Sequence, residues 1–71
     1  MFESEYRKIG ARVVYWRRIR CLSQEKLAEK SSISRGRLSE IEHGKGPSSL
    51  ETLLLICSVL HITLGQLVSD I

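Results

Sequence analysis

Apolar residues recur along this chain at the spacing of an α-helix, and short polar segments interrupt the pattern at close intervals. The first series extends to about residue 20 at steps of three and four residues, and it consists of Phe2, Tyr6, Ile9, Val13 and Trp16. This spacing places the series on one stripe of a helix, which other helices must cover. Because 71 residues suffice for one domain, residues 1–71 are expected to form a single unit.

Two serines divide the middle of the chain into a pair of short helices. Ser23 is a residue type that caps helix N-termini, and it predicts a helix that extends to Lys30. Ser34 offers a second cap only a few residues later, after a turn at residues 31–33. Gly44 is well placed to close this next helix in the left-handed conformation. The middle of the chain is therefore predicted to be a helix, a tight turn and a second helix.

Beyond Pro47 the sequence predicts two more helices. Ser48 and Glu51 have the spacing of a capping box, and Thr63 with Gln66 repeats it. The helix that follows Ser48 is expected to bury Leu50, Leu53, Leu54, Cys57 and Leu60. The predicted fold class is therefore all-α, with five helices and no strands.

Basic residues are concentrated in one part of the chain. All eleven Lys and Arg residues lie between Arg7 and Lys45, and that segment holds only four acidic residues, so both ends of the chain are acidic. Such a basic middle suits a surface that binds a polyanion, and the alternative is an ordinary solvated helix surface.

No arrangement typical of metal binding or catalysis is present in the sequence. Cys21 and Cys57 are far apart and belong to no CxxC pair, so free thiols are expected, with Cys57 in the core. His43 and His61 are isolated from other metal-ligating residues. We therefore expect no catalytic residues, no metal and no cofactor.

The hydropathy pattern argues against a membrane segment. The longest uninterrupted apolar run, Leu53 to Cys57, is far too short to cross a bilayer. Residues 1–6 lack the basic start and apolar core of a secretion signal. The protein is expected to stay in the cytoplasm in which it is made.

A helix, a turn and a second helix allow one helix to enter the DNA major groove while the other contacts the backbone. Here residues 23–30 read SQEKLAEK and residues 33–45 read ISRGRLSEIEHGK. These strings closely resemble the Cro/repressor helix-turn-helix family of phages and bacteria. The resemblance extends over nearly the whole chain, from IGARV at 9–13 to Leu67. It implies a compact domain like that of lambda repressor, with its helix-turn-helix core at residues 23–43.

The resemblance implies that the second helix of this motif reads DNA bases. Arg35 falls at its start, where an arginine can bind guanine O6 and N7 together; the alternatives are a phosphate contact and a solvated side chain. Gly36, Ser39 and Glu40 occupy the neighbouring outward positions. Gly36 allows the backbone to approach the DNA closely. Glu40 fits there if it accepts a hydrogen bond from cytosine N4 or pairs with a nearby arginine such as Arg37.

The resemblance further implies a set of contacts to DNA phosphates, which position a protein without reading sequence. Gln24 is expected to donate to a phosphate, aided by the amides of the helix start, and the plainer alternative is that it only fills the first turn. Ser34, Arg37 and Lys45 are the other expected phosphate contacts.

Two structural expectations also follow from the resemblance. Arg17 on the first helix is placed opposite Glu42, in an ion pair that ties the reading helix to the rest of the domain; the alternative is two separate solvated charges. Ser32 stands where a glycine often makes the turn between the two helices. A non-glycine residue is therefore expected to adopt positive φ there.

A single short reading helix contacts few base pairs, so we expect a homodimer on an inverted-repeat operator in double-stranded DNA. The expected dimer surface consists of Leu55, Leu64, Val68 and Ile71, and the alternative is that these residues close the core of the monomer. Because no further domain follows, we expect no site for a small-molecule effector.

The predicted function is sequence-specific regulation of transcription. The competing hypothesis is an interaction module, such as an antitoxin or an adaptor, in which DNA binding is secondary or absent. Within the family, the sequence leaves open a phage regulator, the controller protein of a restriction-modification system, and an antitoxin.

Overall fold

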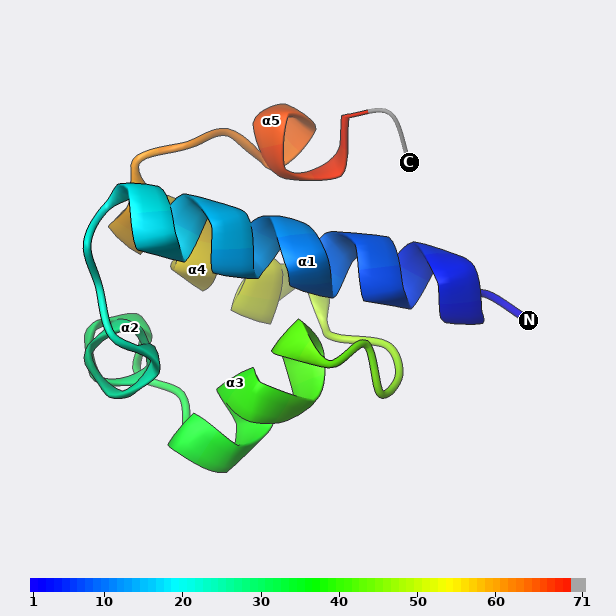
Figure 1. The fold of residues 1–71 in the computed structure, drawn as a ribbon, viewed down its shortest axis with the longest axis horizontal. Coiled ribbons are helices and arrows are strands. Elements are labelled where there is room, and N and C mark those ends of the chain that lie inside the picture. Colours follow the sequence, from blue (N-terminus) through cyan, green and yellow to red (C-terminus); the bar gives the residue numbers. More distant parts are fainter. Residues whose placement is uncertain (70–71) are drawn as a thin grey trace.

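The computed structural model describes residues 1–69, and these residues form five helices without a strand (Figure 1). The helices are α1 (Glu3–Ile19), α2 (Gln24–Ser31), α3 (Arg35–Glu42), α4 (Leu50–Leu60) and α5 (Leu64–Val68). In Figure 1, α1 crosses the middle of the molecule, α5 lies above it, α2 and α3 lie below it, and α4 lies behind. The prediction of an all-α fold with five helices is confirmed.

The predicted caps explain where most of these helices begin. Ser23 and Ser34 each accept a hydrogen bond at 3.0 Å from the amide of the third following residue, so α2 and α3 start directly after them. Thr63 and Gln66 form the reciprocal capping box that the sequence predicted at the start of α5. Each cap satisfies an amide that the first helical turn leaves without a partner.

The start of α4 differs from the prediction by one residue. The cap is Ser49, whose Oγ accepts a hydrogen bond from the Thr52 amide at 3.1 Å. The helix begins at Leu50, so the extended backbone that a cap requires, with φ −67° and ψ 152°, falls at Ser49. The capping box expected between Ser48 and Glu51 is therefore wrong.

One core joins all five helices, since each of them contributes at least one buried apolar side chain. The buried apolar residues are Val13, Leu27, Ala28, Leu38, Ile41, Ile56, Cys57, Leu60, Ile62 and Leu67. Burial also raises the pKa of the Cys57 thiol, as expected for a cysteine that serves as a small core residue.

The face of α4 that enters the core is rotated from the predicted one. Leu50 and Leu54, expected in the core, are 59% and 47% exposed, whereas Ile56 is completely buried. Cys57 and Leu60 are buried as predicted. The physical reason is that α1, α2 and α5 all pack on α4, and Ile56 lies in the core that these helices share. The spacing of leucines alone does not select that side, because α4 carries apolar residues around most of its circumference.

Two glycines allow α3 and the loop after it to lie directly on α1. A Cβ atom at Gly10 would overlap the carbonyl oxygens of Ile41 and Glu42, the second at 2.6 Å. Gly44 adopts φ 67°, as predicted, and a Cβ there would lie 2.6 Å from the Cα of Arg7. The α3 helix is thus seated on α1 by contact between backbones, which leaves little room for movement.

An arginine of α1 and the arginine of its C-cap also hold the last two helices. Arg12 donates to the Gln66 carbonyl in α5 at 2.9 Å. The Nε of Arg20 donates to the Leu60 carbonyl at the end of α4 at 2.7 Å, and its guanidinium lies 5.6 Å from the centre of the Trp16 ring. Cations are favourable at helix C-termini, where carbonyls lack helical partners.

Candidate DNA interface

The turn between α2 and α3 fixes how these two helices are arranged. Ser32 adopts the left-handed conformation, with φ 60° and ψ 36°, as expected for the residue in place of the usual glycine. The amide of Ile33 donates to the Ala28 carbonyl at 3.1 Å, which closes α2. The chain then reaches the Ser34 cap and enters α3, so both helices are anchored at the turn.

Arg17 and Glu42 form a two-bonded ion pair between α1 and the end of α3. The Nε of Arg17 lies 2.8 Å from Glu42 Oε2, and its Nη2 lies 3.2 Å from Oε1. The two side chains are only 14% and 5% exposed, and Arg17 also donates to the Leu22 carbonyl. A pair so sheltered from water depends strongly on both partners, because either charge alone would remain unpaired in the interior.

Gln24, the first residue of α2, connects this ion pair to the start of α3. Its Nε2 donates to Glu42 Oε1 at 3.0 Å, and its Oε1 accepts a 3.4 Å hydrogen bond from the Nε of Arg35. Since an amide nitrogen carries two hydrogens, one of them stays available for another acceptor. Gln24 therefore does more than fill the first turn of its helix.

Arg35 also approaches an acidic residue that the sequence did not single out. Its Nη1 lies 3.8 Å from the Oε2 of Glu25, and the two side chains are 66% and 77% exposed. Glu25 and Arg35 belong to different helices, so no fixed spacing in the sequence signals the pair. Arg35 is thus held loosely, between two residues at the start of α2.

The other outward residues of α3 have partners outside α2. Arg37 pairs with Glu40 at 3.5 Å, as the sequence suggested, and donates to the Pro47 carbonyl at 3.0 Å. Ser39 lies 3.5 Å from the His43 ring. A Cβ at Gly36 would meet nothing within 4 Å, so this position is open to solvent.

Ser34 and Lys45, two of the expected phosphate contacts, are both exposed. The Ser34 oxygen already accepts the hydrogen bond of the cap, and its hydroxyl hydrogen remains to donate. The structure thus brings Ser34, Gln24 and Arg35 together around the starts of α2 and α3. Lys45 lies in the loop beyond the other end of α3.

The residues expected at a dimer surface are only partly exposed. Leu55 is 39% exposed, while Leu64 and Val68 are half-buried and pack against the core. Ile71 lies outside the described residues. The exposed Leu50 and Leu54 enlarge the apolar surface of α4 beyond the prediction.

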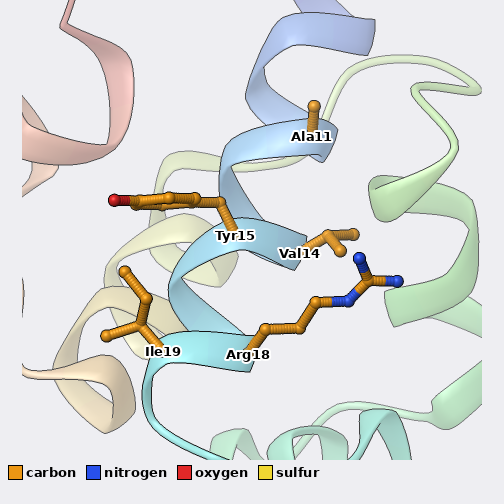
Figure 2. A pocket seen from close by; sticks show the side chains of 5 residues that line it. All are labelled: Ala11, Val14, Tyr15, Arg18 and Ile19. Carbon is orange, nitrogen blue, oxygen red and sulfur yellow. The ribbon is translucent and has the colours of Figure 1, made fainter.

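A shallow surface groove lies on α1 and has a volume of about 700 Å³ (Figure 2). It is lined by Ala11, Val14, Tyr15, Arg18 and Ile19. Tyr15 and Ile19 extend to one side of the helix, and Val14 and Arg18 to the other (Figure 2). None of the expected DNA-contacting residues lines this groove.

Residues 1–69 lack two kinds of feature. None of the helices there combines the length and the apolar composition that a membrane span requires. In the same residues, no three His, Cys, Asp or Glu side chains are grouped in a way that could hold a metal ion.

Comparison with known proteins identifies the family. Residues 16–67 match the family model described as Helix-turn-helix (HTH_3). The chain is 36% identical over 62 residues to the immunity repressor protein of Bacillus phage phi105, and the match covers 87% of the chain. The chain spans 43% of the length of that repressor.

Solved structures with the same fold are also regulators. The restriction-modification controller protein C.AhdI from Aeromonas hydrophila superimposes with a TM-score of 0.87 at 31% identity, over 90% of this chain and 97% of that one. The clp gene regulator ClgR from Corynebacterium glutamicum gives 0.84 at 31% identity, over 87% of this chain and 66% of that one. These relatives are regulatory proteins. The chain therefore belongs to the XRE-type helix-turn-helix family of DNA-binding transcriptional regulators.

Proposed function

We propose that this protein regulates transcription by binding a specific double-stranded DNA sequence, with α3 in the major groove. The observation that carries the proposal is the asymmetry of α3. Its inward side is fixed by Leu38, Ile41 and the Glu42 ion pair, and its start presents an exposed arginine, Arg35. A rigid helix with a basic, solvent-facing start suits base reading.

In this proposal Arg35 reads a guanine, and the smaller neighbours Gly36 and Ser39 allow the helix to lie deep in the groove. Glu40 lowers the affinity for DNA sequences that present no hydrogen-bond donor to its carboxylate. Phosphates are contacted by the exposed side of the two helix starts and by the loop after α3, through Gln24, Ser34, Arg37 and Lys45. The amides at both capped helix starts add to the attraction of phosphate groups.

We further propose a two-fold dimer on an inverted repeat. A dimer would place its two α3 helices in successive major grooves, about 34 Å and about 10 base pairs apart. The exposed leucines of α4, Leu50, Leu54 and Leu55, support a dimer surface near α4 and α5, together with Leu64 and Val68.

Selection of bound sequences from a random DNA pool tests the proposed function, because a reader of this kind enriches one inverted repeat. The Arg35→Ala variant should then relax the preference at one symmetric pair of positions, a loss of about 1 to 3 kcal/mol of discrimination per half-site. The Lys45→Ala variant should instead weaken binding to all sequences alike and reduce the salt dependence. A pool without enrichment would refute the proposed function.

Sedimentation tests the dimer separately. Leu55→Lys should shift the protein toward monomer, because a charge would be placed in the proposed apolar surface. Tyr15→Lys, at an exposed aromatic residue of α1 outside the proposed dimer surface, is the matched control and should leave association unchanged. A wild-type protein that stays monomeric at high micromolar concentration, with and without DNA, would rule out the dimer.

A further inference from the structure

Arg35 makes two contacts to the start of α2, and these contacts engage the atoms that a base contact would use. Its Nε donates to Gln24 Oε1 at 3.4 Å, and its Nη1 lies 3.8 Å from Glu25 Oε2. A two-bonded contact to guanine needs two N–H groups on one edge of the guanidinium, both aimed at the base. The Nη1 nitrogen cannot face Glu25 and lie deep in the major groove at the same time.

Among the acidic residues near the outer surface of the helix-turn-helix, Glu25 is the one that would lose its ion-pair partner if Arg35 moved to contact a base. Within the part of the chain that the structure describes, Glu29 is near Lys26 on its own helix and Glu40 is near Arg37 on its own helix. Neither pair needs to break for Arg35 to move. Glu25 would be left as an unpaired negative charge at the start of α2, on the side that faces the phosphates in the proposed complex.

We propose that Glu25 competes with DNA for the guanidinium of Arg35 and thereby limits the affinity for the operator. This inference rests on the proposed function, since it assigns Arg35 as the base reader. The competition acts unequally on different DNA sequences. On non-specific DNA, Arg35 remains with Glu25 and nothing is lost, whereas at the operator the pair must break and its free energy is subtracted from the base contact.

The expected size of the effect follows from the exposure of the pair. Ion pairs this exposed contribute little, so removal of Glu25 should raise operator affinity about two- to five-fold per protomer. In a two-fold dimer the factor applies twice. Affinity for non-specific DNA should rise less, so the ratio of operator to non-specific affinity should increase.

The test uses the full chain with the Glu25→Gln substitution, which removes the charge and retains the shape of the side chain. Affinities are measured for the selected operator duplex and for a scrambled duplex of the same composition, at one salt concentration. The matched control is Glu29→Gln, because Glu29 is an exposed acid on the same helix and its substitution changes the net charge equally. Glu25→Gln should raise the ratio of the two affinities, and Glu29→Gln should leave it unchanged.

A second pair of measurements assigns the effect to Arg35. In the Arg35→Ala background, Glu25→Gln should no longer change the affinity ratio, because the contested guanidinium is absent. In the free protein, the Arg35 Nη–H signals in NMR spectra should exchange with water faster in Glu25→Gln than in wild type, because Nη1 is the nitrogen that faces Glu25.

Three results would overturn the inference. One is an unchanged affinity ratio in Glu25→Gln, and another is a change that persists without Arg35. The third is identical Arg35 Nη–H signals in the two proteins. Failure of the proposed function is distinguishable from these results, because the wild-type protein would then bind operator and scrambled duplex equally.

Discussion

Arg17 and Arg35 are the same residue type, yet they serve opposite ends of α3 in different ways. Arg17 forms a two-bonded pair with Glu42 that is almost completely sheltered from solvent, with the closer contact at 2.8 Å. Arg35 lies 3.8 Å from Glu25 in a pair exposed to water. Because the first pair is buried, loss of either partner destabilises the protein strongly. Because the second pair is exposed, its partners can separate at little cost. A DNA base can take the place of the acidic partner in a pair of this second kind.

The largest expected effect concerns the sheltered pair. Glu42→Leu should lower the free energy of unfolding by about 3 to 5 kcal/mol, because Arg17 keeps its charge in a site with little water. The double variant Arg17→Met with Glu42→Leu should recover much of that loss, since no unpaired charge remains. Denaturant titrations measure both effects, and a coupling energy near zero would show that the pair holds nothing together.

The backbone contact between α1 and α3 is the next target. Gly10→Ala should cost about 1 to 3 kcal/mol, because the new methyl group must displace the carbonyls at the end of α3. Gly36→Ala is the matched control in the open part of α3, and it should stabilise the protein by up to about 1 kcal/mol through helix propensity. Equal effects of the two substitutions would contradict the close contact.

A smaller effect is expected at the cap of α3. Ser34→Ala should cost about 1 kcal/mol, because the amide of Arg37 loses its partner. Ser34→Asp keeps a cap and should leave stability nearly unchanged, but its negative charge should weaken binding to every DNA sequence. Thermal unfolding and DNA titration of both variants separate the two roles. If Ser34→Asp binds DNA as well as wild type does, Ser34 does not face a phosphate.

The smallest effect on stability is expected at Arg35. Arg35→Ala should change the free energy of unfolding by about 0 to 1 kcal/mol, and the difference should fade in high salt because the pair with Glu25 is exposed. Denaturant titrations at low and high salt provide the measurement. If Arg35→Ala lowered the free energy of unfolding as much as Glu42→Leu does, the Arg35 pair would be as important for stability as the Arg17 pair, which would contradict the comparison.

The sequence predicted well those features that depend on neighbours along the chain. Ser23 and Ser34 cap helices as predicted, and Thr63 with Gln66 forms its capping box, because each reaches an amide only three residues away. Ser32 adopts positive φ because the tight turn requires it, whichever residue stands there. Such features are determined within a single turn of chain.

Features that depend on packing between helices were harder to predict. Ser48 was predicted to cap α4, and the structure places the cap at the adjacent Ser49. Leu50 and Leu54 are exposed because the neighbouring helices cover another side of α4. Gly10 did carry a signal, since an isolated glycine inside a helical pattern often marks close contact. Its partner helix could not be read from spacing.

The connections that α1 makes to the other helices affect how the proposed dimer would fit DNA. It contacts α3 at Gly10 and α5 through Arg12, and its C-cap Arg20 contacts α4, so α3 and the proposed dimer surface are both attached to this one helix. The helix has 17 residues and is about 26 Å long. In the proposed dimer, the α1 helices of the two protomers would set the distance between the two α3 helices, because an α-helix of this length bends little. The dimer would then fit only one spacing of half-sites. Inserting a single base pair at the centre of the operator should therefore strongly weaken binding.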